Sequence, residues 1–296
     1  VHSLFRLMSA RLSIMRADLT GAVAEAHWGG VLAVVEVVSN LCSAIEHFAR
    51  SLAGQVRDPE ELALEPVRPP SSYRFGSIGQ GAVVVESLAR CRECLQVLDR
   101  DGLRRSLEPV SIELATVSGF WAGRVGLEAM ATAIWGDPAS GLNRLMAAIA
   151  DQPIGAREQD EPMGGLMLGR ARSLLLCRFG AFEAAAAALD TIPPDLRALS
   201  RARVLLWAGR FGQAVRTMDL ALPDPNLLHT DRLQLMMIRG AATSLEGSMT
   251  PDIASDTVTA VHQLLLSRSY LGFATLPSRA RKAILEISSS LASDPE

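Results

Sequence analysis

Two segments of the chain repeat each other at a spacing of 29 residues, and this repeat limits the possible folds more than any other feature. In each segment a glycine is followed two residues later by phenylalanine, then by alanine, and then by two apolar residues before a proline. A recurrence of this kind at a fixed period is typical of repeat architectures. The matched positions are Gly180 and Gly209, Phe182 and Phe211, Ala185 and Ala214, Leu189 and Met218, and Ile192 and Ala221.

The spacing predicts a hairpin of two helices in each repeat. Glycine ends the first helix, where a left-handed residue is required. The phenylalanine starts the second helix and is expected to be buried between the two, and the alanine allows them to approach. One hairpin cannot bury its apolar face alone, so neighbours must stack. The spacing resembles the tetratricopeptide repeat. We therefore expect an all-α fold, an α-solenoid of tetratricopeptide-like antiparallel helix pairs.

Helical periodicity extends over most of the chain, and proline and glycine clusters divide it into helix-sized pieces. A long stretch rich in proline breaks this pattern, and it divides the chain into N-terminal helical pairs (1–55), a Pro-rich connection (56–81) and the repeat array (82–296). The expected helices are 2–27, 31–54, 82–99, 106–134, 138–150, 163–178, 181–190, 195–208, 211–221, 229–246, 252–268 and 277–291.

Composition excludes several classes of protein. The apolar stretch from Leu4 to Met15 contains two arginines, so it is no signal peptide, and the run from Val31 to Ile45 is too short and too polar to span a membrane. Four cysteines make no disulfide scaffold, which favours a reducing cytoplasm. The net charge of −3 gives no basic face, so we expect no direct nucleic-acid binding.

Candidate catalytic and metal-binding motifs are weak. Cys91 and Cys94 form a CxxC, but they lie in a helical pattern with apolar neighbours and are interpreted as core residues rather than as a redox or metal pair. The isolated histidines, including His47, are interpreted as surface or cap residues. Since no nucleophile elbow, HExxH motif or phosphate loop occurs, we expect no enzyme activity, no metal and no cofactor.

A family resemblance covers about the last 130 residues. It rests on Arg170-Ala-Arg172 with the leucines that follow, on the stretch from Arg201 to Arg210, and on the stretch from Ser267 to Arg279. From Leu166 onward the chain is similar to the helical sensor region of LuxR-type transcriptional regulators of the MalT class. In that family an ATPase and a helix-turn-helix accompany this region. Neither motif occurs here, so the chain is expected to be a piece of a longer regulator or a protein of its own.

Four arginines are the candidate binding residues: Arg170, Arg172, Arg201 and Arg203. They lie on the first helices of successive pairs, which line the concave groove in tetratricopeptide stacks. Guanidinium groups there are suited to holding carboxylates or phosphates. One residue of each close pair is expected to face the groove, and an offset of 31 residues, from 170 to 201 and from 172 to 203, is expected to preserve the face. Alternatively, all four extend along the stack and bridge neighbouring helices.

Two functions remain open at this point. The first is a non-catalytic sensor module of a LuxR-family regulator that binds a small anionic ligand or a protein and signals to an effector domain. The second is a stand-alone tetratricopeptide-like scaffold that docks a peptide or protein in its groove. The resemblance favours the first. The ligand, the partner and the oligomeric state are not specified by the sequence.

Overall fold

Helices make up the regular structure of the protein. The computed structural model describes residues 2–16, 18–33, 36–56, 78–152 and 162–292, and no strand occurs among them, which confirms the all-α class. In chain order the elements are α1 (His2–Met15), α2 (Leu19–Val31), α3 (Glu36–Leu52), α5 (Ile78–Gln96), α6 (Arg100–Leu107), α7 (Ile112–Ser118), α8 (Trp121–Trp135), α9 (Pro138–Ala150), α10 (Pro162–Phe179), α11 (Phe182–Ala188), η2 (Leu189–Thr191), η3 (Pro194–Leu196), α12 (Ala198–Trp207), α13 (Phe211–Ala221), α14 (His229–Glu246), α15 (Pro251–Leu266), α16 (Leu271–Ala274) and α17 (Ser278–Ala292).

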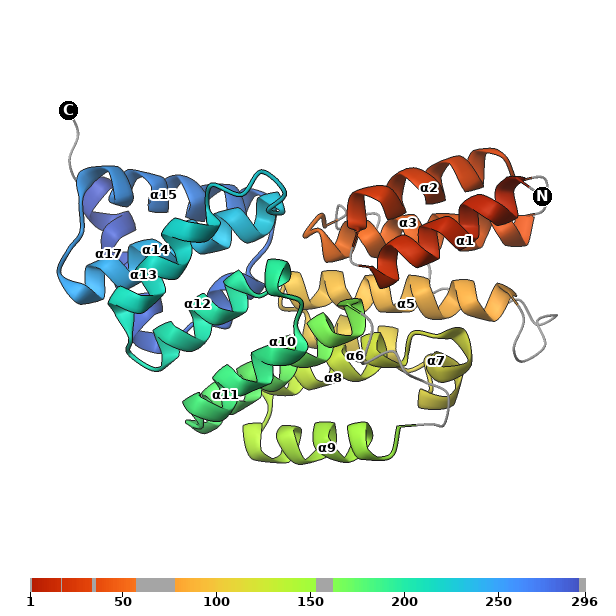
Figure 1. Cartoon of the computed structure of the whole chain (residues 1–296), viewed down its shortest axis with the longest axis horizontal. Helices are drawn as coiled ribbons and strands as arrows, with labels where there is room; N and C mark the ends of the chain where they lie inside the picture. The colour runs from red at the N-terminus through yellow and green to blue at the C-terminus, as the bar shows by residue number, and fades with distance from the viewer. Residues whose placement is uncertain (1, 17, 34–35, 57–77, 153–161, 293–296) are drawn as a thin grey trace.

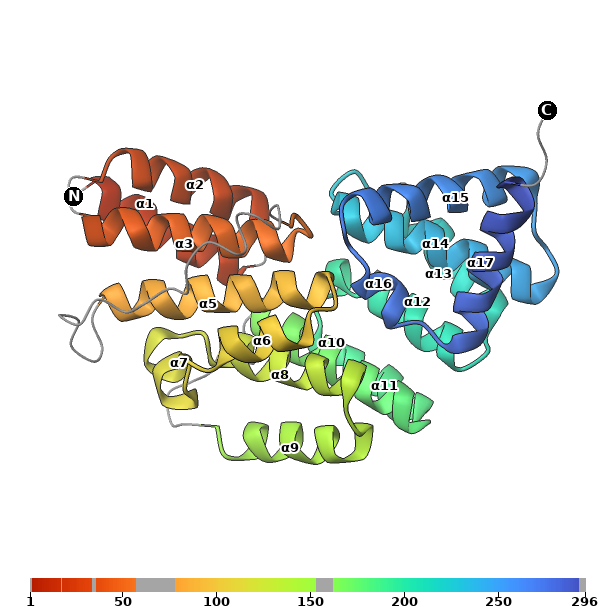
Figure 2. The same cartoon turned by 180° about the vertical axis from the view of Figure 1, so that it is seen from behind.

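Helices that follow one another along the chain mostly pack together, as Figures 1 and 2 show. The helices form two groups, which we call the N-terminal half (α1 to α11) and the C-terminal half (α12 to α17). The two termini lie at opposite ends of the molecule (Figure 1). The halves meet where α10 packs on α12 and where α16 packs on α5. None of the described helices has both the length and the apolar character needed to cross a bilayer.

The apolar core follows this division. The largest cluster of buried side chains runs through the N-terminal half and takes in only Val204 and Leu271 from the C-terminal half. A second cluster belongs to the C-terminal half, and a third lies among α8, α9 and α10. The main core therefore crosses the junction between the halves through Val204 and Leu271.

The two repeats form the helix hairpins that the 29-residue spacing predicts. Gly180 and Gly209 adopt left-handed φ angles of 89° and 74°, which reverse the chain between α10 and α11 and between α12 and α13. The matched alanines that follow, Ala185 and Ala214, are both fully buried.

The expectation that Phe182 and Phe211 are buried is wrong, since both are only half-buried. Each ring lies on the first residue of its helix, at the edge of the hairpin rather than inside it. The guanidinium of Arg279 lies 5.0 Å from the centre of the Phe211 ring and covers one face of it. Both rings thus lie at a less enclosed position than predicted.

Two of the expected helices are divided in the structure. The helix expected at 2–27 ends at Met15, and α2 starts after Asp18, whose carboxylate accepts a hydrogen bond from the Gly21 amide at 2.8 Å. Capping by aspartate favours a new helix start over continuation. The helix expected at 106–134 is three elements, because Pro109 follows the end of α6 and Gly119 ends α7 in a left-handed conformation.

Most of the Pro-rich connection expected at 56–81, residues 57–77, lies outside the described residues. After it, α5 begins at Ile78, earlier than the expected start at residue 82. Helix α5 packs on α3 along its length, so the helices on either side of the connection share one core.

Candidate functional site

A small cavity lies at the junction of the two halves, beside Val204 and Leu271 of the main core. Its walls come from α5, α8 and α10 of the N-terminal half and from α12, α14 and α16 of the C-terminal half. Its volume is about 40 Å³. About 10–15 Å³ is enough for one water, whereas pockets for drug-sized ligands measure about 300–1,000 Å³. The cavity therefore suits a compact chemical group.

Helical periodicity positions the residues that line the cavity. On α10, Arg170 is followed at three, four and seven residues by Ser173, Leu174 and Cys177, which share its face. On α12, Ser200 and Arg203 lie three residues apart, and further side chains of that helix complete the wall. Met130, Leu174, Leu199, Val204, Trp207 and Leu271 supply apolar surface.

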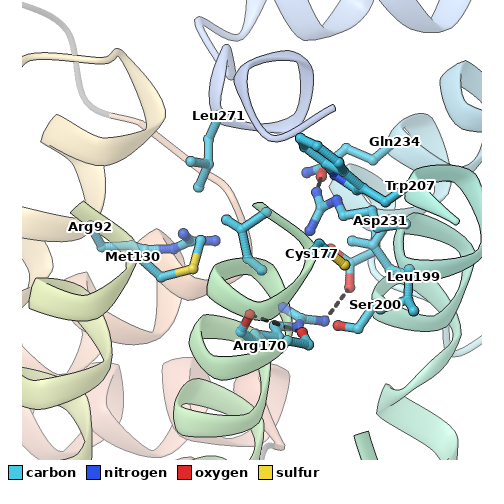
Figure 3. Close-up of a pocket in the computed structure, with 14 residues that line it drawn as sticks. Arg92, Met130, Arg170, Cys177, Leu199, Ser200, Trp207, Asp231, Gln234 and Leu271 are labelled. Atoms are coloured by element: carbon cyan, nitrogen blue, oxygen red, sulfur yellow. Dashed lines mark hydrogen bonds and ion pairs between the residues drawn. The ribbon is translucent and has the colours of Figure 1, made fainter. Parts of the chain in front are cut away.

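Three arginines and one carboxylate dominate the chemistry of the cavity. Arg92 extends from α5 on one side, Asp231 lies on α14 on the opposite side, and Arg170 lies between them on α10, as Figure 3 shows. Arg170 Nη2 lies 3.1 Å from Asp231 Oδ2. Arg203 donates through Nη2 to Gln234 Oε1. In the described part of the chain, Asp231 is the only acidic residue that lines the cavity. The formal charge of this group is thus two positive.

The three arginine side chains are partly buried, and their guanidinium groups are incompletely satisfied. The side chains of Arg170 and Asp231 are only 19% and 16% exposed. The Nε atoms of Arg92, Arg170 and Arg203 are buried and have no hydrogen-bond partner in the described part of the chain. Buried polar groups in folded proteins are normally paired, and buried charges nearly always are. Arg172 Nε, outside the cavity, is likewise unpaired, so it is the position of the other three donors around one cavity that suits them to an anionic group.

The pKa values of Arg92 and Arg203 also indicate crowded positive charge around the cavity. Desolvation is the main cause, and together with the positive charge of Arg170, and against the attraction of Asp231, it lowers the pKa of the Arg92 and Arg203 guanidiniums to about 10. Both groups still carry their charge at neutral pH. The fold therefore holds like charges together in a poorly solvated space, which an anion in the cavity would neutralise.

Two of the four arginines selected from the sequence line this cavity. Arg170 and Arg203 are there, whereas Arg201 is exposed and Arg172, partly buried, is not among the lining residues. The expected 31-residue equivalence is therefore wrong, because it pairs Arg170 with Arg201 and Arg172 with Arg203. Measured from the glycine that ends each first helix, Arg172 and Arg201 are the equivalent pair. Since α10 and α12 approach the cavity from different halves, they present non-equivalent positions to it.

Sequence reasoning missed Arg92 and Asp231. Arg92 lies between the two cysteines of the CxxC, and the chemistry expected of that motif involves only the cysteines. A signal was nevertheless present, since Arg92 falls one turn after Leu88 in a helix whose apolar positions are otherwise filled by Cys91 and Leu95. A charged residue in such a stripe is unusual and indicates a buried partner or ligand. Asp231, next to the start of α14, carries no comparable signal.

Cys91 and Cys94 lie in the main core, as their apolar neighbours predict. Burial raises the pKa of the Cys94 thiol to about 11 and raises that of Cys91 as well, so neither thiol is poised to react. Among the described residues, no cluster of three or more His, Cys, Asp or Glu side chains has the geometry to hold a metal ion.

The interpretation of the histidines as surface or cap residues is wrong for His47. Its side chain is 11% exposed and lies between two carboxylates of α5, with Nδ1 2.7 Å from Glu86 Oε2 and Nε2 3.1 Å from Glu93 Oε1. Burial alone would lower the pKa of His47, but the hydrogen bonds and charges of Glu86 and Glu93 outweigh it and raise the pKa above its ordinary value. This contact joins α3 to α5.

Comparison with protein-family models, with curated proteins and with solved structures finds no match to the chain. The residues of the cavity are therefore interpreted from their geometry and chemistry alone.

Proposed function

We propose that the chain is a non-catalytic sensing module that binds a small anionic ligand in the cavity between its halves. The observation that carries this proposal is the group of three partly buried arginines, Arg92, Arg170 and Arg203, opposed among the described lining residues by the carboxylate of Asp231. Such a group is costly for an empty protein and favourable for one that receives an anion.

The position of the cavity supports sensing. Arg92 and Arg170 belong to the N-terminal half, and Arg203 and Asp231 to the C-terminal half. A ligand held by both sets links the halves and favours the arrangement in which all three guanidiniums reach it. A ligand shifts a conformational equilibrium only through such differential contacts. A partner that contacts either half would then respond to the change in how the two halves are arranged.

The chemistry of the cavity favours binding over catalysis. Arginine stays protonated near neutral pH and cannot serve as a general base. Asp231 is engaged with Arg170 at 3.1 Å and faces an excess of positive charge. The cavity thus offers strong donors for an anion, and its one candidate proton acceptor is already bound to a cation. The module is accordingly proposed to be no enzyme.

The proposed fold is a tetratricopeptide-like solenoid, and the proposed context is a LuxR-type regulator of the MalT class. The two hairpins with left-handed Gly180 and Gly209 support the first, and the sequence resemblance from Leu166 onward supports the second. The module is proposed to work in the cytoplasm and to make no nucleic-acid contact of its own, for which the net charge of −3 is the supporting observation.

A second candidate function, a scaffold that docks a peptide or protein, is favoured by a separate surface. A wide groove of about 1,130 Å³ lies among α6, α8 and α9 and is lined by five arginines and three acidic residues. Several of its charges are already paired, such as Arg124 with Glu128 at 2.5 Å. An acidic peptide is the partner that this groove would suit, and the cavity arginines would then have no part in binding.

Thermal unfolding separates the two functions. The whole chain is melted with phosphate, sulfate, malonate or citrate, or with glucose as a neutral control, at matched ionic strength. At least one anion is expected to raise Tm, since a ligand that binds only the folded state stabilises it, by about 2.7 kcal/mol at a hundred times Kd. Arg92→Gln should abolish the effect, and Arg201→Gln, on an exposed arginine, should preserve it. An equal response of wild type and Arg92→Gln to every anion would contradict the sensor function.

A further inference from the structure

The charge inside the cavity specifies more than the sign of its ligand. Three guanidiniums and one carboxylate leave two positive charges, and among the described residues no other acidic side chain lines the space. A monoanion would neutralise only half of that charge. Resting on the proposed function, we propose that the recognised group is a compact tetrahedral dianion, that is, a phosphate group, either as inorganic phosphate or as a phosphate monoester.

Size supports this class of ligand. The cavity of about 40 Å³ has room for a few water-sized atoms. A phosphate group places two charges and several acceptor oxygens on a single centre. A dicarboxylate needs a carbon chain between its two charges and therefore more length. The volume thus favours two charges on one centre over two charges on separate groups.

The directions from which the arginine donors approach the cavity also support a tetrahedral dianion as the ligand. Arg92, Arg170 and Arg203 come from three different helices, α5, α10 and α12, so their guanidiniums approach the cavity from different sides. A carboxylate accepts hydrogen bonds mainly in its own plane, whereas a tetrahedral oxyanion presents oxygens in all directions. Arginine is also the side chain best matched to phosphate oxygens. The unpartnered Nε atoms of all three arginines are available for this purpose.

Asp231 sets the net charge of the cavity and the position of Arg170. Its Oδ2 lies 3.1 Å from Arg170 Nη2, and the side chain is 16% exposed. By neutralising one of three positive charges it lowers the cost of the empty state and sets the remaining charge at two. It also holds Arg170 toward the C-terminal half, since Asp231 belongs to α14. With Asp231 the cavity residues carry a net charge of two positive instead of three, which matches the charge of a dianion.

Calorimetric titration of the whole chain tests the proposal with four probes: inorganic phosphate, sulfate, malonate and acetate. Phosphate carries about one charge near pH 5 and about two near pH 8, whereas sulfate carries two at both. Phosphate is expected to bind at least about tenfold more weakly at the lower pH. Sulfate serves as the control for titration of the protein itself and should change far less. Malonate and acetate should bind more weakly than sulfate at either pH.

Variants connect the binding to the cavity. Arg92→Gln and Arg203→Gln each remove one donor and one charge and should weaken sulfate binding about tenfold or more. Arg201→Gln is the matched control on the same helix as Arg203 and should bind as wild type does. Circular dichroism and Tm without anion show that each variant is folded, so a loss of binding cannot be confused with a loss of structure.

The outcomes distinguish the ligand class from the function. Sulfate binding that depends on Arg92 and Arg203, with phosphate following its charge, supports the dianion. Malonate or acetate binding more tightly than sulfate, with the same dependence on Arg92, overturns the dianion and leaves the anion sensor intact. Folded wild type that binds none of the four overturns both.

Discussion

At the scale of single residues, the arginines of the cavity are expected to favour anion binding and to lower the stability of the protein without an anion. Arg92 and Arg203 are partly buried beside Arg170, and desolvation together with the repulsion from Arg170 lowers their pKa to about 10. A purely structural arginine stabilises the fold through its contacts, whereas a binding arginine held without its ligand destabilises it. The two roles therefore differ in the sign of the stability change when the side chain is replaced.

We expect Arg92→Met to stabilise the chain by about 1–2 kcal/mol in buffer without multivalent anions. Replacing a buried charge by an apolar side chain of similar volume is often stabilising, because the cost of desolvating the charge disappears. Urea unfolding followed by circular dichroism measures the change. Arg201→Met, at an exposed site, should stay within about 0.5 kcal/mol of wild type. A loss of stability for Arg92→Met would assign this side chain a structural role instead.

His47 should give the chain a pH-dependent stability. Its pKa in the folded protein is raised, so protonation contributes stability that is complete below the unfolded value of about 6.5 and is lost as the pH rises through the folded value. The groups that face it are Glu86 and the buried Glu93, and Arg90 pairs with Glu86 at 3.2 Å. Deprotonation leaves both carboxylates without their shared cation.

The free energy of unfolding should therefore fall as the pH rises above about 6.5 in wild type, with a smaller fall in His47→Gln. Urea titrations at a series of pH values measure it. His262→Gln, on the exposed face of α15, is the control and should follow wild type. Parallel curves for wild type and His47→Gln would show that the ion pairs make no net contribution.

At the scale of helices and turns, the left-handed glycines between paired helices are the points that the repeat most requires. Gly180 has a φ of 89° and open space around the position of a Cβ atom, so only backbone strain opposes a side chain there. Gly81, inside α5, also has open space but a helical backbone. The two glycines thus separate the effect of conformation from the effect of crowding.

Gly180→Ala should cost about 1–2 kcal/mol, since alanine is strained in the left-handed region. Gly81→Ala should instead stabilise the chain by about 0.5–1 kcal/mol, because alanine favours a helix interior. Thermal or urea unfolding of both variants gives the comparison. Equal effects of the same sign would show that the turn between α10 and α11 does not depend on the left-handed glycine.

How far the sequence predicts the elements depends on how local their signals are. The hairpins at Gly180 and Gly209 are set by residues within one turn of each glycine, and they form as expected. The helix breaks at Asp18, Pro109 and Gly119 have local signals too. The apolar periodicity continues on both sides of each break, however, and it predicts one long helix instead. The half-buried state of Phe182 and Phe211 depends on which neighbouring helices cover them, and no local pattern specifies that.

At the scale of the whole molecule, the candidate site exists only because two halves meet. Gln96, at the end of α5, accepts hydrogen bonds from the Tyr270 amide at 2.8 Å and from Ser269 Oγ at 2.9 Å, and Thr230 Oγ1 donates to the Ala53 carbonyl at 2.7 Å. These contacts join segments more than 170 residues apart in sequence. They fix the position of α5 and therefore of Arg92 relative to α12 and α14.

The same reasoning explains what the sequence could not provide about the site. Arg170 and Arg203 were recognisable as arginines on the first helices of successive pairs. Their grouping with Arg92 and Asp231 depends on long-range packing, since Asp231 lies 61 residues from Arg170, with which it pairs. Periodicity gives the face on which a residue lies but not the residue of another helix that it meets. The charge balance of the cavity, on which the proposed ligand rests, therefore required the tertiary structure.

One crystallographic measurement tests the central claim most directly. Crystals of the whole chain are grown with selenate, a tetrahedral dianion whose selenium gives an anomalous signal. We expect an anomalous peak in the cavity between Arg92, Arg170 and Arg203, with selenate oxygens within about 3 Å of their guanidinium nitrogens. A cavity without a peak, in crystals that bind selenate elsewhere, would contradict the account.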